Sequence, residues 1–305
     1  MMRRLAYSVF VCLLAATVQA SVTQVDGTIV PHIGATGCTD VDNELQPCID
    51  GEEVAAGGTA GALNVVRDAD IVPQTFLPDV ANVVTFKDIS ESAGFENSFG
   101  YYNVGDDVST AAGRAANLRP IMGCGVPAAM HPNAANGYVQ NAEHLLAGKP
   151  PGTQNTTTVN FATEMAAGRY KGGFIAFYLI TPQGHPGGSA DNCGDFEGTA
   201  GTFFFGRIYF TQRDLNNDGD FVHHLVYTSK ANAKQFYFGF EDLFRGGDND
   251  FDDMAMMVRG LTPPCLPTAE LCNNPTTTAT ARSTTIRSTS ASRARSASAP
   301  ACAPA

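Results

Sequence analysis

From position 81 onward, apolar residues gather in short runs that are separated by polar loops containing Gly and Pro. Each run has the length of one β-strand and is too short for a typical helix. Short strands joined by such loops favour an antiparallel arrangement. The runs are 83–86, 95–104, 173–180, 203–210, 221–228, 235–241 and 251–258.

The run 235–241 shows the clearest alternation. Phe236, Phe238 and Phe240 stand two positions apart, so an extended chain places them on one face, which we expect to face the core. The segment 133–149 has the composition of a short helix. The pattern therefore predicts an all-β fold, an antiparallel β-sandwich or jelly-roll-like domain with one or two short helices.

The two ends differ from this central pattern. Residues 1–20 (MMRRLAYSVFVCLLAATVQA) combine two Arg, a short apolar run and small residues before a cut after Ala20, which predicts a secretory signal peptide. Residues 273–305 are rich in Ser, Thr, Ala, Pro and Arg, which predicts a disordered tail. Between them we expect a loop-rich N-terminal arm or small lobe at 21–80 and a β-sandwich domain at 81–272.

The charge of the chain limits the classes of partner that it can bind. The 305-residue chain has a formal charge of −11, with 30 acidic and 19 basic residues. Two basic residues lie in the predicted signal and four in the predicted tail, so the remaining chain carries 13 basic and 30 acidic residues, a net −17. This charge argues against nucleic-acid and anionic-membrane partners, and bound cations would offset part of its self-repulsion. No later segment has the roughly 20 apolar residues of a membrane-spanning helix.

Eight cysteines are present, and Cys12 lies in the predicted signal. Six others between the signal and the tail suggest disulfides in an exported chain, although six cysteines allow about 15 pairings. The short spacings favour Cys38–Cys48 and Cys265–Cys272, which leaves Cys124–Cys193. Asn155 begins an N-glycosylation sequon, whose use depends on the host.

A first acidic constellation lies between two predicted strands. Its side-chain oxygens alternate and are followed by Gly219, as in the first half of a calcium-binding loop. The twelfth position of such a loop would be Leu225, which offers no carboxylate, so an Asx-rich hairpin turn is an equal alternative. The candidate ligands are Asp214, Asn216, Asp218 and Asp220.

A second constellation spans 241–253 and holds six carboxylates with one Arg. Carboxylates that converge without a counterion repel one another, and a divalent cation removes that conflict. If 248–252 is extended, its three Asp share one face while Phe251 points into the core. Gly246-Gly247 permits a chain reversal that could bring the start of the segment to the same ion. The candidate calcium ligands are Glu241, Asp242, Asp248, Asp250, Asp252 and Asp253.

The segment FGFEDLFRGGDNDFDDMAM (238–256) resembles the closing signature of domain-of-unknown-function family 4114, which occurs in exported and surface proteins. ESAGFENSFGYYNV (91–104) resembles its opening signature and NNDGDFVHHLV (216–226) its middle element, so the resemblance covers about 81–259. It implies a β-rich extracellular module that binds calcium and has no established activity. Two departures are Asp252, where the family commonly has Asn, and His223, where it often has Asp.

Three functions remain open at this stage. The first is a secreted, non-catalytic, calcium-binding module that recognises a glycan or another surface polymer, by analogy with β-sandwich lectins. The second is a secreted metal-assisted hydrolase that uses the same carboxylates. The third is a structural envelope or matrix protein. His223 and His224 are adjacent in a predicted strand and therefore point to opposite faces, which disfavours joint binding of one metal.

Overall fold

The computed structural model describes residues 21–34, 38–39, 42–90, 97–123, 156–181 and 207–264. Several expectations lie outside these residues: the signal peptide at 1–20, the helix at 133–149, the sequon at Asn155, the tail at 273–305, and the pairings Cys124–Cys193 and Cys265–Cys272. Among the described residues, no helix is long and apolar enough to cross a membrane.

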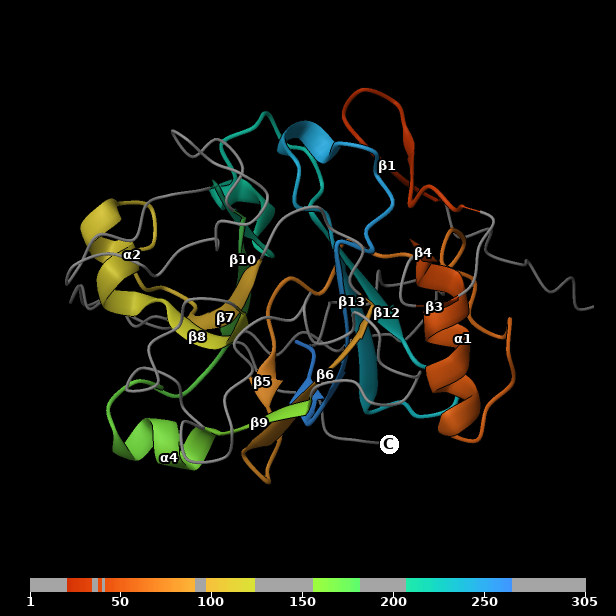
Figure 1. Ribbon diagram of the computed structural model, residues 1–305. Coiled ribbons are helices and arrows are strands. Elements are labelled where there is room, and N and C mark those ends of the chain that lie inside the picture. Colours follow the sequence, from red (N-terminus) through yellow and green to blue (C-terminus); the bar gives the residue numbers. More distant parts are fainter. Residues whose placement is uncertain are drawn as a thin grey trace, which may run out of the picture.

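Two antiparallel sheets form the body of the domain (Figure 1). The four-stranded sheet has the order β11-β10-β7-β8 and the five-stranded sheet has the order β12-β13-β14-β6-β9. The expected all-β fold is confirmed. The strands of the first sheet are β7 (Ser98–Asn103), β8 (Arg119–Gly123), β10 (Ile175–Thr181) and β11 (Arg207–Phe210); those of the second are β6 (Val83–Ser90), β9 (Thr156–Asn160), β12 (His224–Thr228), β13 (Gln235–Phe240) and β14 (Met254–Arg259).

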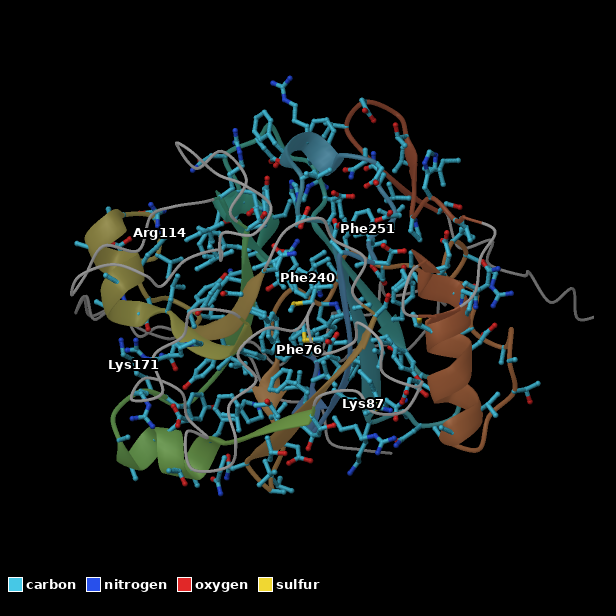
Figure 2. The ribbon with its side chains drawn as sticks, in the orientation of Figure 1. Phe76, Lys87, Arg114, Lys171, Phe240 and Phe251 are labelled. Atoms are coloured by element: carbon cyan, nitrogen blue, oxygen red, sulfur yellow. The ribbon has the colours of Figure 1, made fainter. Side chains whose placement is uncertain are left out.

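The main core lies between the two sheets and is built by alternation along their strands. Phe236, Phe238 and Phe240 of β13 all enter it, as their spacing predicts. They meet Phe177 of β10, whose ring centroid lies 5.4 Å from that of Phe238. Phe76 joins the same cluster (Figure 2). Fully burying one such aromatic side chain contributes about 1.5–3 kcal/mol, so this layer supplies much of the hydrophobic stabilisation.

The outer face of the five-stranded sheet is covered by α1 (Leu45–Ala55) and the segments around it. Leu45 and Ile49 of this helix pack in one cluster with Tyr237 of β13 and Met257 of β14. Pro47 stands in the first helical turn, where its missing N–H removes no intrahelical bond. Part of the segment that was expected to be a loop-rich arm is therefore a helix that forms a layer over the sheet.

The outer face of the four-stranded sheet carries a third cluster beside α2 (Ala111–Asn117). Ala176, Tyr178 and Ile180 of β10 belong to it, whereas the residues between them enter the main core. Because β10 is covered on both faces, every one of its residues is buried. The third described helix, α4 (Phe161–Ala166), follows β9 and begins where the Asn160 side chain accepts hydrogen bonds from two backbone N–H groups.

Residues 21–80 are integrated into the sandwich. Buried Gln24 donates from Nε2 to the Val222 carbonyl at 3.0 Å, and its Oε1 accepts from the Val222 N–H at 2.7 Å. Phe76 forms a β-bridge with Ile175 of β10. The remaining elements are short: β1 (Val22–Thr23) pairs with β2 (Ile29–Val30), β3 (Cys38–Thr39) with β4 (Asp42–Asn43), and β5 (Leu77–Pro78) with β15 (Leu261–Thr262), while η2 (Arg213–Leu215) and η3 (Phe244–Gly246) are single 3-10 turns.

Candidate metal centre

The second acidic constellation forms the connection between β13 and β14. Immediately after β13 come Glu241 and Asp242, and the chain then passes through η3 and turns back along β13. On the return, Asp252 forms a parallel β-bridge with Phe240. The connection therefore folds back against the strand from which it starts, which brings its first and last carboxylates together.

A close backbone approach at Gly239 makes this return possible. A Cβ added at Gly239 would lie 2.8 Å from the carbonyl oxygen of Phe251, so the returning chain leaves no room for a side chain there. Phe251 is fully buried among the residues that pack between the five-stranded sheet and α1, although its φ of 64° is unusual for a non-Gly residue. The packing of its ring pins the loop in a strained conformation.

The expected reversal at Gly246-Gly247 is present. Both residues have positive φ, 78° and 41°. Beyond the reversal, the Asn249 N–H donates to Glu241 Oε2 at 2.9 Å, and the Leu243 N–H donates to Glu241 Oε1 at 3.1 Å. The Glu241 side chain thus sits inside the loop, and the loop backbone fixes its orientation.

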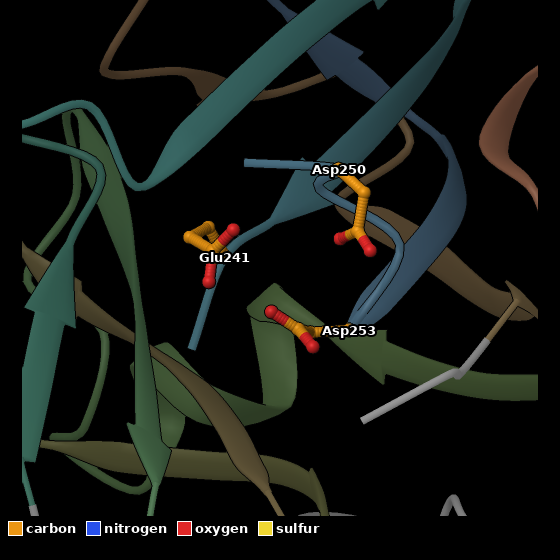
Figure 3. A group of neighbouring side chains, drawn as sticks. All are labelled: Glu241, Asp250 and Asp253. Atoms are coloured by element: carbon orange, nitrogen blue, oxygen red, sulfur yellow. The ribbon is translucent and has the colours of Figure 1, made fainter. Parts of the chain in front are cut away.

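Three carboxylates converge at the base of this connection. One oxygen each from Glu241, Asp250 and Asp253 lies within 4.8 Å of the other two. Figure 3 shows the three carboxyl groups pointing toward one another. Glu241 is fully buried and Asp253 is 7 % exposed, whereas Asp250 is half-buried. Three oxygens at this spacing can share one cation, because calcium binds carboxylate oxygens at about 2.3–2.6 Å.

The electrostatics of the group favour a cation. Burial is the main cause that raises the pKa of Glu241 to about 9. The hydrogen bond from Leu243 opposes this shift, and the charges of neighbouring Asp residues reinforce it. Burial and the charges of Asp242 and Glu241 raise the pKa of Asp253 well above its ordinary value. Burial and the Asp248 charge raise the pKa of Asp250. A divalent ion would reverse these shifts by stabilising the ionised forms.

Asp242 and Asp252 border this group. The Asp242 N–H donates to Asp253 Oδ2 at 2.8 Å, and Asn97 Nδ2 donates to Asp242 Oδ2 at 2.8 Å. Burial raises the pKa of Asp242 to about 7, and burial together with the Asp250 charge raises that of Asp252 to about 8. Oδ1 of Asp252 and Oδ1 of Asn97 are buried without a hydrogen-bond partner among the described residues. These oxygens would gain from a nearby cation or an ordered water.

Asp248 lies apart from its expected neighbours. The prediction that three Asp share one face assumed an extended segment, but Asn249 and Phe251 both have φ of 64°. Left-handed residues break the two-residue alternation, so Asp248 is exposed and lies outside the convergent group. Its charge still raises the pKa of Glu241. The expectation that Phe251 enters a core is correct.

In the first constellation an asparagine side chain closes the turn after β11. Asn216 accepts from the Phe210 N–H at 2.8 Å through Oδ1 and donates to the Phe210 carbonyl at 3.1 Å through Nδ2, so its amide closes the turn. Asp218 is buried and pairs with His223 Nε2. Asp214 and Asp220 are exposed, and the three carboxylates of this loop form no convergent group. The geometry therefore supports the second constellation more strongly.

The two adjacent histidines occupy different environments. His223 Nδ1 lies 2.9 Å from the Glu241 carbonyl, and its ring stacks on Tyr209 with centroids 3.7 Å apart. His224 packs against Phe238 and Phe240 in the main core, and neither of its ring nitrogens has a partner among the described residues. Burial lowers the pKa of His224 to about 3, so this ring is neutral.

One further carboxylate near the site is not evident from the sequence pattern. Glu44 precedes α1, about two hundred positions before the acidic connection, yet its charge raises the pKa of both Asp250 and Asp252. Glu44 Oε2 also accepts from the Gly34 N–H at 2.7 Å. Only the docking of α1 on the sheet brings this residue close, so spacing along the chain could not reveal it.

The comparisons with known proteins identify one family. Residues 167–260 match the family model of a domain of unknown function, DUF4114. This segment is therefore similar to the DUF4114 family. The DUF4114 match confirms the resemblance of the closing and middle elements and includes all of Glu241–Asp253, while the opening element at 91–104 lies before its boundary. Neither the curated proteins nor the solved structures contain a match to the chain.

The close approach at Gly239 gives a direct test of the loop packing. Gly239→Ala should lower the free energy of unfolding by about 1–3 kcal/mol, because the new methyl group would press on the returning backbone. Gly51→Ala in α1 is the matched control: a Cβ there meets nothing within 4 Å, so it should be neutral or stabilise by roughly 0.5–1 kcal/mol. Urea unfolding of both variants measures the difference. Equal stabilities for the two would contradict the described return path.

Proposed function

We propose that this protein is a secreted, calcium-stabilised β-sandwich module that serves as a non-catalytic binding domain outside the cell. The observation that carries the proposal is the convergence of Glu241, Asp250 and Asp253 in a buried, pinned loop. Oxygen ligands of this kind suit a hard cation, and calcium tolerates their irregular arrangement better than magnesium, which demands near-ideal octahedral geometry.

Two sequence features support the extracellular part of the proposal. The predicted signal at 1–20 directs export, and the cysteines fit an oxidising compartment. Cys48 is buried on α1, and its proposed partner Cys38 lies on the neighbouring strand β3. Calcium is abundant outside cells and would offset part of the −17 charge of residues 21–272.

In this proposal calcium is structural. It would connect the end of β13 with the start of β14 through the carboxylates that now repel one another, and it would hold the surrounding loops in place for binding a glycan or another surface polymer. Because the ion binds only the folded chain, it stabilises the domain by mass action.

Calorimetric titration of calcium into EDTA-treated, dialysed protein tests the proposal. We expect saturable binding together with a rise in Tm. At a free calcium concentration about 100 times the Kd, the gain is about 2.7 kcal/mol. Because part of the carboxylate cluster is protonated in the metal-free protein, calcium should also release protons, so the measured heat should vary between buffers of different ionisation enthalpy. A flat titration and an unchanged melt would refute the proposal.

A further inference from the structure

A cavity of about 200 Å³ lies beside the acidic connection and is separate from the convergent carboxylates. It is smaller than the roughly 300–1,000 Å³ of pockets for drug-sized ligands, so it fits one small ring rather than an extended molecule. Its wall combines arginines, aromatic rings and polar groups from α2, β11, η3 and the turn after β11. The residues that matter for the argument are Arg114, Arg207, Tyr209, Asn217, Asp218 and Phe244.

The cationic side of this cavity is unusual for so acidic a chain. The Arg207 guanidinium carbon lies 4.0 Å from the Phe244 ring centroid, and that of Arg245 lies 5.3 Å from the same centroid. Lys87, Arg169 and Lys171 pair with carboxylates elsewhere in the domain. Within the described part of the chain, Arg207 and Arg245 form no ion pair with a carboxylate, and both side chains are exposed. A guanidinium held on an aromatic face is oriented to bind a carboxylate.

The lining of the cavity also offers a buried acceptor. Asp218 is 4 % exposed, and its Oδ2 pairs with His223. Its Oδ1 is buried and has no hydrogen-bond partner among the described residues. Stacking on Tyr209 holds the His223 ring that orients Asp218. A ligand hydroxyl would satisfy Oδ1, because an ionised carboxylate only accepts hydrogen bonds.

We propose that this cavity binds a carboxylated sugar residue, a uronic acid unit of an acidic glycan. Its carboxylate would lie on Arg207, and a ring hydroxyl would donate to Asp218. The negative wall at Asp218 would repel a dianionic phosphate, so a singly charged polyol fits both walls better. This cavity is a second site, apart from the candidate calcium site, and its lining includes none of Glu241, Asp250 and Asp253.

Ligand-observed NMR with methyl glucuronide tests this assignment. Saturation transfer and line broadening should reveal binding to the wild-type protein, and methyl glucoside, the neutral analogue, should bind at least 10-fold more weakly. Arg207→Gln should weaken glucuronide binding at least 10-fold. Lys234→Gln makes the same charge change at an exposed position in the loop between β12 and β13, at the end of that hairpin away from Glu241, and should leave binding within 2-fold of wild type.

The outcomes separate this proposal from the calcium proposal. Asp250→Asn should keep glucuronide binding while it loses calcium binding, and Arg207→Gln should show the reverse, with an unchanged Tm as evidence of folding. Glucuronide binding that is undetectable at millimolar concentration, or equal for the two sugars, would overturn the assignment. Equal losses in Arg207→Gln and Lys234→Gln would also overturn it, and so would tighter binding of inorganic phosphate than of glucuronide.

Discussion

Asp250→Asn is expected to remove most of the calcium-dependent stabilisation without unfolding the metal-free protein. Asp250 is the most exposed of the three convergent carboxylates, and its hydrogen bonds within the loop go to Asp252, whose N–H donates to Asp250 Oδ1 at 3.4 Å. The amide removes a charge that raises the pKa of its neighbours Asp252 and Glu241. The variant in EDTA should therefore melt at or above the wild-type Tm. In excess calcium it should gain far less than the wild type, for which a gain of about 2–3 kcal/mol corresponds to roughly 5–10 °C.

Asp248→Asn is the matched control for this result. It makes the same chemical change in the same loop, but the carboxylate it removes is exposed and lies outside the convergent group. We expect its calcium-dependent rise in Tm to differ from the wild-type rise by no more than about a third, because an exposed carboxylate that does not touch the ion attracts it only weakly through solvent. Differential scanning calorimetry of the three proteins, each with EDTA and with calcium, measures both effects. A calcium response lost equally in both variants would contradict the assignment of ligands.

The metal-free protein is expected to lose stability as the pH rises from about 4 to about 9. The carboxyl pKa values of Asp242, Asp252 and Glu241 are raised on folding, to about 7, 8 and 9. A group whose folded pKa lies above its unfolded value contributes stability that is fully present below the unfolded pKa and is lost as the pH rises through the folded pKa. We therefore expect a fall on the order of a few kcal/mol between pH 5 and pH 9 in EDTA.

Calcium should cancel most of this fall, because the ion binds the ionised carboxylates. Two buried groups outside the site set the limits of the effect. Burial raises the pKa of Asp88 well above its ordinary value. The loss of stability that accompanies ionisation of Asp88 at rising pH should therefore remain when calcium is present. His224, with its pKa lowered to about 3, acts in the opposite sense: its contribution is present above pH 6.5 and is lost as the pH falls toward 3. Thermal melts across pH 4–9, with and without calcium, test the prediction, and parallel curves would contradict it.

The alternating core could be predicted from the sequence because its signal is local. Phe236, Phe238 and Phe240 stand two residues apart and enter the main core, while Tyr237 between them packs in the cluster beneath α1. The helix α1 could not be predicted in this way. Pro47 and Gly51 interrupt its pattern, and its helical form depends on packing Leu45 and Ile49 against a sheet formed by distant residues.

The position of the candidate site could be predicted from the sequence, but its exact members could not. Six carboxylates in the connection between two strands indicate a cation, and the double Gly indicates a reversal. Which of the six converge depends on the left-handed backbone at Asn249 and Phe251, which residue type does not reveal. The approach of Glu44 depends on tertiary docking. Local composition therefore indicates the candidate site, and the fold determines which of its carboxylates lie close together.

The most direct test of the account is a crystal structure grown with calcium, with anomalous diffraction data to locate the ion. We expect an anomalous peak between Glu241, Asp250 and Asp253, with carboxylate oxygens about 2.3–2.6 Å from it. A crystal in saturating calcium with no peak at this position, or with the ion bound only in the turn at 214–220, would contradict it.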